Sequence, residues 1–207
     1  MQISEATAFL ENAYTVLNNK YFGGELPPVV ITVQSSPKAY GHYTTWDAWH
    51  DDINKGYREI NLGAETLDRP VEFTVSTLLH EMVHHYCAVN GIKDTSRGGT
   101  YHNKRFKAEC EKRDLIIDYD PRIGFSPTRP SKALMDFVDG QGWQGVNLSR
   151  QGVLGLSGGS GGKGRGRSNG VRKYICPECG NSVRATKAVN IGCLDCDCPM
   201  ELEEKCG

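Results

Sequence analysis

Two histidines and a glutamate stand in the order H-E-x-x-H at His80, Glu81 and His84. On a helix, residues four apart lie one turn above each other on the same face, so both imidazoles can reach one Zn²⁺ while Glu81 projects beside the metal. Zinc there would polarise a water molecule and a scissile carbonyl, and Glu81 could move the water's proton to the leaving amine. The motif predicts metal-assisted amide hydrolysis.

The residues around the motif predict a buried helix that would position it. Pro70 suits a first turn and Asn90-Gly91 suits a left-handed stop, so the helix should run from about Val71 to Val89. A buried helix would not carry bare imidazoles without partners, which argues against a chance occurrence of the motif. The helix is expected to be buried because it carries an apolar stripe, which consists of Val75, Leu78, Leu79, Met82, Val83 and Tyr86.

A zinc peptidase needs a third protein ligand, and the residues leave two candidates open. One is His102, eighteen residues beyond His84, and the other is a helical carboxylate such as Glu109. The metzincin pattern is excluded, because Cys87 and Asn90 stand where that class has Gly and His. The neighbouring His85 points about 100° round the helix, so we expect it to orient other groups or lie on the surface.

The rest of the first 148 residues predicts a small sheet with further helices, an α+β fold. Four aromatic residues (Tyr40, Tyr43, Trp46 and Trp49) could line a groove that takes a peptide as an added strand. Aromatics in a short β-region pack more often in the core, which is the interpretation we favour. The lone His42 and His50 fit hydrogen bonding better than metal binding. Helices are expected at 4–22, 71–89, 102–113 and 131–139, and strands at 29–34, 39–45, 57–62 and from 115.

The cysteines predict a second metal site. Of eight, six fall in the last 32 residues, and Cys176, Cys179, Cys193 and Cys196 form two C-x-x-C pairs separated by thirteen residues. This spacing is typical of a Cys₄ zinc ribbon, with strands expected at 182–185, 189–191 and 199–202. Cys198 is an alternative to Cys196, but it would make an unusual knuckle, so we treat it as spare.

Composition divides the chain into modules. A length of 207 residues and 38% hydrophobic content suit one medium domain plus an accessory module. We expect a zincin-like domain over 1–148, a Gly-rich basic linker over 149–171 and the ribbon over 172–207; residues 152–170 contain nine glycines. Without a signal peptide or a membrane-spanning run, the protein is expected in the cytoplasm, away from membranes.

Several motifs occur in an order that resembles the SprT-like zinc metalloproteases, the family of bacterial SprT and the eukaryotic DNA-protein crosslink protease Spartan. The matching segments are KYFGGELP, AYGHY, REINL, LLHEMVHHY and YHNKRF, followed by the zinc ribbon. The resemblance implies a minimal zincin fold and peptidase activity. It also implies His102 as third zinc ligand, because the family takes that ligand from the His opening the helix after the motif. The longer GIKDTSRGGT loop departs from the family pattern.

Basic charge is concentrated near the ribbon, although the formal net charge is only −1. Residues 163–187 carry seven Lys or Arg and one acidic residue. Together with the resemblance, this predicts DNA binding through phosphates, with single strands favoured if Tyr174 stacks on a base. The alternative is that the basic, Gly-rich linker only keeps the chain soluble and binds no nucleic acid. The candidate contacts are Lys163, Arg165, Arg167, Arg172 and Lys173.

Two functions follow from these features. The first is a peptidase acting on DNA-associated proteins, with one catalytic and one structural Zn²⁺. The second is a non-catalytic zinc-ribbon protein that binds nucleic acid or regulates a partner. Glu81 favours the enzyme, because a purely structural metal site does not need a carboxylate at that position.

Overall fold

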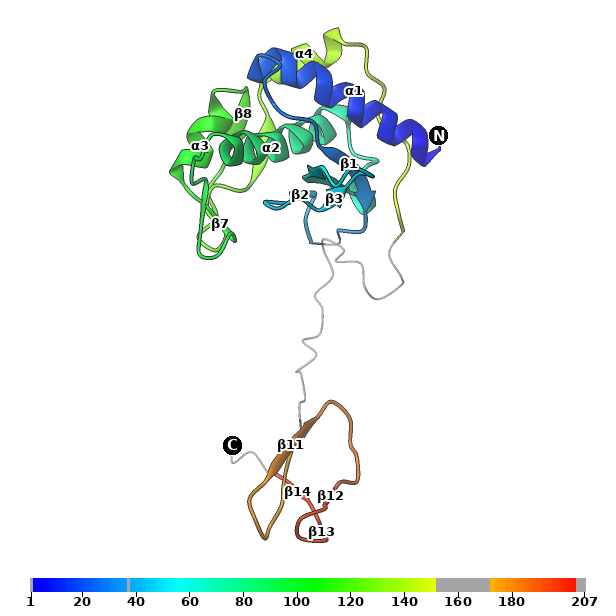
Figure 1. The fold of residues 1–207 in the computed structure, drawn as a ribbon, viewed down its shortest axis with the longest axis vertical. Coiled ribbons are helices and arrows are strands. Elements are labelled where there is room, and N and C mark those ends of the chain that lie inside the picture. The colour runs from blue at the N-terminus through cyan, green and yellow to red at the C-terminus, as the bar shows by residue number, and fades with distance from the viewer. Residues whose placement is uncertain (1, 37, 152–171, 204–207) are drawn as a thin grey trace. The chain divides into compact units, whose positions relative to one another are not determined.

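A computed structural model describes residues 2–36, 38–151 and 172–203 of the chain (Figure 1). The chain divides into two compact units, residues 1–158 and residues 159–207. The first combines helices with small sheets, and the described part of the second contains strands only. This confirms the α+β class that the sequence predicts.

Two long helices form the centre of the first unit. Helix α2 spans Val71–Val89, the bounds that its flanking Pro and Asn-Gly predict, and helix α1 spans Ile3–Phe22. The five apolar residues Val75, Leu78, Leu79, Met82 and Val83 of α2 are fully buried in a core shared with α1. Helix α1 begins one residue before the expected start at residue 4, because Gln2 and Glu5 form a capping box.

A three-stranded sheet has the order β1-β5-β2. Strand β1 (Val30–Gln34) pairs parallel with β5 (Glu59–Gly63), and β2 (Gly41–Tyr43) pairs antiparallel with β5 from the other side. All five residues of β5 are buried because it is the central strand. Strand β2 has β5 as its only partner among the described strands, so it forms an edge of this sheet.

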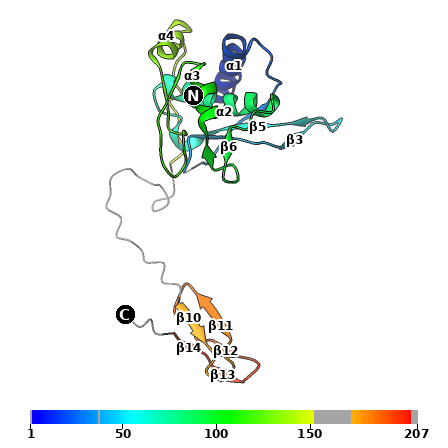
Figure 2. The same ribbon diagram turned by 90° about the vertical axis from the view of Figure 1, so that its left-hand side faces the viewer.

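The aromatic segment after β2 is a hairpin, β3 (Trp49–His50) with β4 (Gly56–Tyr57), which projects from the unit (Figure 2). The interpretation that the four aromatic residues of 40–49 pack in the core was wrong for three of them. Tyr40, Trp46 and Trp49 are exposed, Trp46 by 65%, and only Tyr43 packs against the core. The Trp49 indole N–H instead donates to Glu59, which fastens the hairpin to β5.

Short elements follow α2 and complete the unit. They are β6 (Thr95–Ser96), β7 (Tyr101–His102), α3 (Lys104–Glu111), β8 (Leu115–Ile117), β9 (Thr128–Pro130) and α4 (Lys132–Gly140), with a short 3₁₀ helix at Ala64–Thr66 before α2. His102 therefore lies in a strand, whereas the sequence predicted it within a helix; Asn103 is the N-cap of α3. Contacts with the first unit extend past residue 148, since the backbone N–H of Arg150 donates to the Ala64 carbonyl at 2.8 Å.

The second unit is a pair of small sheets. One has the order β11-β10-β14 (Ser182–Ala185, Arg172–Ile175 and Glu201–Leu202), and the other pairs β12 (Gly192–Cys193) with β13 (Cys198–Pro199). The strand at 182–185 was predicted with the correct bounds, but β10 was not predicted and residues 189–191 form no strand. Within the described ranges, no helix is long and apolar enough to cross a bilayer.

Candidate active site

Three histidines converge in the first unit. His80 and His84 come from one face of α2, and His102 comes from β7. Their candidate ligand nitrogens all lie within 4.8 Å of one another. The structure thus brings together the two motif histidines and the third ligand that the family resemblance implied.

Each ring is held by a hydrogen bond on its outer nitrogen, Nδ1. His102 Nδ1 lies 3.3 Å from the Ile123 carbonyl, which can only accept. His84 Nδ1 lies 2.5 Å from the Asp94 carboxylate. His80 Nδ1 lies 2.7 Å from the Thr128 hydroxyl, which donates its own proton to Ser126 and therefore accepts from His80. All three Nδ1 atoms thus carry protons, which leaves Nε2 of each ring as the nitrogen that can bind a metal.

The inward-facing nitrogens favour a cation between them. His84 Nε2 lies 3.0 Å from His102 Nε2, so the two nitrogens face each other at the distance of a hydrogen bond. Burial, with the neighbouring His84, lowers the pKa of His102 to about 4 and that of His80 well below its usual value, so both rings stay neutral. Two lone pairs at this distance repel unless a positive charge lies between them. Three imidazoles that turn Nε2 inward and leave one position open fit zinc.

Glu81 lies in the same buried region, as expected for the general base. Burial raises the pKa of its carboxyl to about 7, while the charge of His84 opposes that shift. The edge strand passes close by, because a Cβ added at Gly41 would meet Glu81 Oε1 at 3.2 Å and the Asn61 carbonyl at 2.9 Å. A carboxylate with this pKa can both accept and return a proton near neutral pH.

Phe106 forms an apolar wall behind the three histidines. Its ring stacks on His84 at 4.3 Å between centroids and meets His80 and His102 edge to face at 4.7 Å and 4.8 Å. The side chain is fully buried. Asn103 supports this arrangement, since its side chain accepts the backbone N–H of Phe106 at the start of α3.

His85 is buried, so the part of our expectation that placed it on the surface was wrong. Its Nε2 donates to the Pro27 carbonyl at 3.1 Å, which leaves Nδ1 to accept from the Tyr43 hydroxyl at 3.2 Å. Arg58 in turn donates to the Tyr43 oxygen at 2.7 Å. This chain of hydrogen bonds ties α2 to the edge strand β2, an orienting role.

The carboxylate alternative for the third ligand is engaged elsewhere. Glu109 accepts from Lys112 at 2.6 Å and from Arg113 at 2.8 Å, and its carboxylate is not part of the histidine group. Its pKa is lowered by these bonds, although burial opposes the change. A carboxylate held by two cations is a poor competitor for zinc.

Sequence reasoning missed the residues that hold the histidines. Asp94 lies in the GIKDTSRGGT loop, and Ile123 and Thr128 lie near β9. A carboxylate ten residues after a ligand histidine is a usable signal, because metal-bound imidazoles commonly donate to a carboxylate. Thr128 and the Ile123 carbonyl carry no such signal, since only the fold brings them to the helix.

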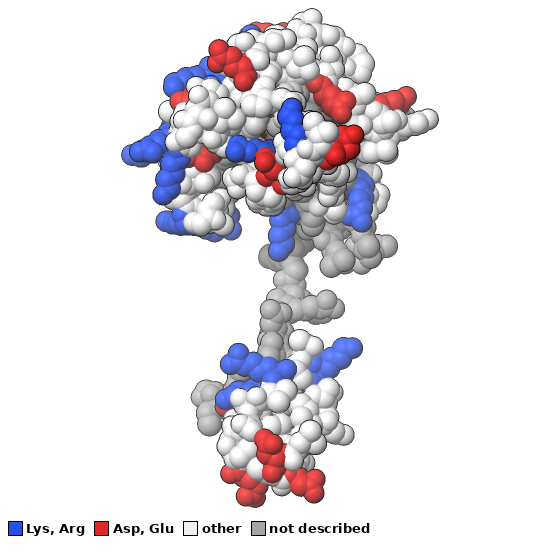
Figure 3. Space-filling model, in the orientation of Figure 1, with Lys and Arg blue, Asp and Glu red and all other residues white. Residues whose placement is uncertain are grey.

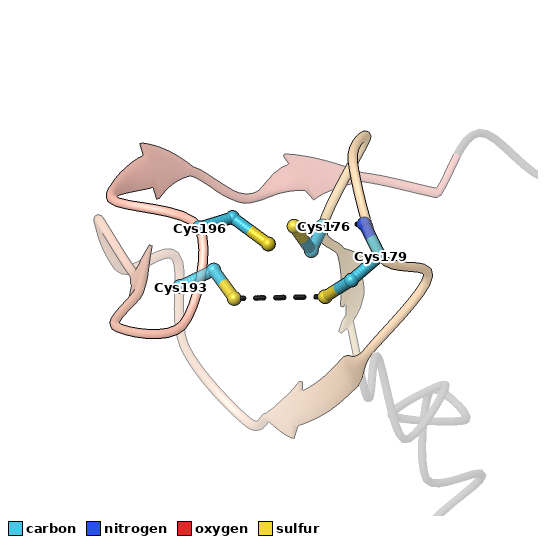
Figure 4. Close-up of side chains that lie close together, drawn as sticks. All are labelled: Cys176, Cys179, Cys193 and Cys196. Carbon is cyan, nitrogen blue, oxygen red and sulfur yellow. Dashed lines mark hydrogen bonds between the residues drawn. The ribbon is translucent and has the colours of Figure 1, made fainter.

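The second unit contains a cysteine cluster. The thiol sulfurs of Cys176, Cys179, Cys193 and Cys196 all lie within 4.8 Å of one another and point to a common centre (Figure 4). The Cys179 and Cys193 sulfurs are 3.7 Å apart, close to the separation that a tetrahedral zinc imposes on its ligands. Cys198, which we expected to be spare, also contacts the cluster, with its sulfur 3.5 Å from that of Cys176.

The predicted nucleic-acid contacts are only partly described. Lys163, Arg165 and Arg167 lie outside the described residues, whereas Arg172 and Lys173 lie on β10. Tyr174 is buried, and its hydroxyl accepts the backbone N–H of Val189. The buried ring of Tyr174 is therefore not open to stacking on a base, the condition on which the single-strand preference depended.

Comparison with known proteins gives one match. The sequence profile of the SprT-like family matches residues 10–118, more than half of the chain. These residues contain the three histidines, Glu81 and Asp94, and they exclude the cysteine cluster. Searches of curated proteins and of solved structures find no match.

Proposed function

Because the chain belongs to the SprT-like family, we propose that its first unit is a zinc-dependent peptidase whose catalytic residue is Glu81. The observation that carries this proposal is the orientation of the three imidazoles. Each has its proton fixed on Nδ1, and the free nitrogens converge beside a buried carboxyl of pKa about 7. His80, His84 and His102 would hold the metal.

In this proposal the residues of the chain divide the chemistry between them. Zinc would supply a Lewis acid that polarises the attacking water and the scissile carbonyl. Glu81 takes a proton from the attacking water as the water oxygen adds to the carbonyl carbon. The protonated Glu81 then donates that proton to the amine nitrogen as the C–N bond breaks, which restores the carboxylate. Water is consumed, and a carboxylic acid and an amine are formed.

Strand β2 supports a peptide as the substrate. Its side opposite β5 offers backbone N–H and C=O groups, to which an extended peptide can add as a further strand. Gly41 keeps this strand within contact distance of Glu81. The exposed Tyr40, Trp46 and Trp49 lie on or near the same strand, where they could contact the substrate's side chains.

The proposed physiological substrates are proteins associated with DNA. Strands β10 and β11 carry basic residues, and Lys and Arg gather at one end of the second unit while Asp and Glu gather at the other (Figure 3). Among the described residues, Arg172 and Arg184 have no ion-pair partner, whereas Lys173 pairs with Glu203 at 2.7 Å. Unneutralised cations on a zinc-held module suit phosphate binding without sequence preference.

The test of the peptidase is Glu81→Gln. Gln keeps the shape of the side chain and cannot accept the proton, so turnover should fall by at least about a hundredfold while zinc content stays unchanged. Digestion of a denatured protein by purified protein is the assay. Wild-type turnover in the variant would contradict the catalytic role of Glu81. Zinc content distinguishes loss of chemistry from loss of the site.

A further inference from the structure

An open pocket of about 390 Å³ lies beside the His102 segment of the first unit. Tyr101 and Asn103, the two neighbours of His102 in the sequence, both line it, and Lys104, Tyr119 and Phe125 complete the lining. The pocket therefore borders the backbone that carries His102, although its lining contains none of the three histidines. Neither the peptidase chemistry nor the edge strand makes use of it.

Three aromatic rings give the pocket its character. Tyr119 is 56% exposed, and its ring lies 5.1 Å from that of Phe125. The Tyr101 hydroxyl donates to the Tyr119 hydroxyl at 3.2 Å, which fixes the two rings relative to each other. An exposed ring held in place by its neighbours is a stacking surface for a planar ligand.

Cations surround these rings. The Arg97 guanidinium lies 4.2 Å from the Tyr101 ring centre, and the Lys107 ammonium lies 5.3 Å from that of Phe125. Lys104 is part of the lining itself. Figure 3 shows Lys and Arg side chains gathered over α3 and β7, the elements that carry the pocket.

Much of this positive charge is not neutralised. In the described parts of the chain, Arg97, Lys104 and Arg105 have no ion-pair partner. The acidic side chains of the adjoining segment are already paired, Asp120 with Arg122 at 2.9 Å and Asp118 with Arg129 at 3.2 Å. The pocket thus combines aromatic faces with free cations, so its ligand should carry both a flat ring and negative charge.

We propose that this pocket binds an unpaired nucleotide of a single-stranded nucleic acid. The base stacks on Tyr119, and the phosphates lie against Arg97, Lys104 and Arg105. A peptide side chain would need the apolar lining but not a group of free cations, whereas a strand has one phosphate per nucleotide. A duplex keeps its bases stacked on each other, so the pocket selects single strands.

The pocket is fastened to the candidate metal ligand. The backbone N–H of Phe125 donates to the His102 carbonyl, and the N–H of His102 donates to Ile123, both at 3.0 Å. Gly124 packs so closely that an added Cβ would lie 2.1 Å from the His102 carbonyl oxygen. A strand bound here would keep any protein attached to it close to Glu81, at high effective concentration.

This inference takes its class of ligand, a nucleic acid, from the proposed association with DNA. The experiment below tests the pocket separately from that association. The experiment is an anisotropy titration of the full chain with fluorescent oligo(dT) and with a blunt duplex, over a series of salt concentrations. The pocket variant is Arg97→Gln with Lys104→Gln and Arg105→Gln. The control is Lys38→Gln with Lys55→Gln and Lys132→Gln, which removes the same charge from residues that do not line the pocket.

For a single strand, each lost phosphate contact should reduce the slope of the logarithm of the binding constant against the logarithm of the salt concentration by about 0.7. The pocket variant lacks three cations, so its slope should be smaller than that of the wild type by about two. The control should lose little. In a separate variant, Tyr119→Ala should weaken oligo(dT) binding by about tenfold and duplex binding much less, whereas Tyr119→Phe should keep the affinity. Photocrosslinking of iodouracil-substituted oligo(dT), mapped by mass spectrometry, should place the adduct within residues 97–125.

Three results would overturn the pocket. The first is equal affinity and salt slope in the pocket and control variants. The second is an adduct confined to residues 172–203, with binding lost when Arg172, Lys173 and Arg184 are changed to Gln, which would leave the DNA association to the ribbon alone. The third is a wild type that binds neither oligo(dT) nor the duplex but does bind a fluorescent acidic peptide, which would remove nucleic acid from both proposals.

Discussion

Replacing Asp94 should show how much of the metal affinity comes from outside the H-E-x-x-H motif. Asp94 Oδ2 lies 2.5 Å from His84 Nδ1, and the carboxylate is only 17% exposed. Burial acts to raise the pKa of Asp94, but the hydrogen bond and charge of His84 hold it below the usual value. Asp94 is therefore ionised at neutral pH, and its charge makes the imidazole a stronger zinc ligand.

Two substitutions separate the charge from the hydrogen bond. Asp94→Asn can still accept the His84 proton through its amide oxygen, so it exchanges a charge-assisted bond for a neutral one. That difference is about 1 kcal/mol, or about fivefold in the dissociation constant for zinc. Asp94→Ala removes both contributions and should weaken zinc binding by about 10- to 100-fold.

The assay is a competition titration of the zinc-free protein against a fluorescent zinc chelator at neutral pH. Asp118→Asn is the matched control, since it makes the same chemical change at a carboxylate that is 59% exposed and pairs with Arg129. Zinc bound by the cysteine cluster is measured separately, because cysteine thiols that hold zinc are protected from a thiol-reactive reagent. Zinc affinity within twofold of wild type for Asp94→Ala would refute the argument that this bond stabilises the site.

Three further predictions concern the edge strand, the third ligand and the ribbon. Gly41→Ala should lower peptidase turnover at least tenfold with zinc retained, because the new Cβ would lie 2.9 Å from a backbone oxygen and 3.2 Å from Glu81, the proposed general base; unchanged kcat/KM would contradict this close approach. His102→Ala should release zinc from the first unit at chelator concentrations that Glu109→Ala withstands; equal loss from both would reopen the carboxylate alternative. Cys193→Ser should abolish zinc binding and folding of the second unit, whereas Cys198→Ser should keep the ion, measured by zinc content and by protection of the thiols.

Local patterns in the sequence were sufficient to predict the elements that position the motif. The bounds of α2 follow from Pro70 and Asn90, because both act through backbone geometry that needs no tertiary partner. The pairs of cysteines likewise indicate their own cluster, since each C-x-x-C pair is a local unit. The strand β11 was predictable from its alternation of polar and apolar residues between the two cysteine pairs.

The remainder depended on contacts between distant segments. Burial of Glu59 and Asn61 in β5 could not be predicted, because their partner Thr32 comes from β1 and the hydrogen bond from Trp49 comes from the hairpin. The exposure of Trp46 had the same origin, since the hairpin projects instead of folding onto the core. His102 was placed in a helix because Asn103 was not identified as the cap that starts α3 one residue later.

The three hydrogen bonds that hold the histidines also limit how this site could be transplanted. Helix α2 alone contains His80, Glu81 and His84, so a designer who grafted this helix onto another scaffold would transfer the whole motif. The graft would lack Asp94, Thr128 and the Ile123 carbonyl, and its imidazoles would be free to rotate or to carry their protons on Nε2. The smallest portable unit is therefore discontinuous, the helix together with residues 94, 102, 123 and 128. Recombination between related chains should keep activity only when its crossover points leave these segments in one parent.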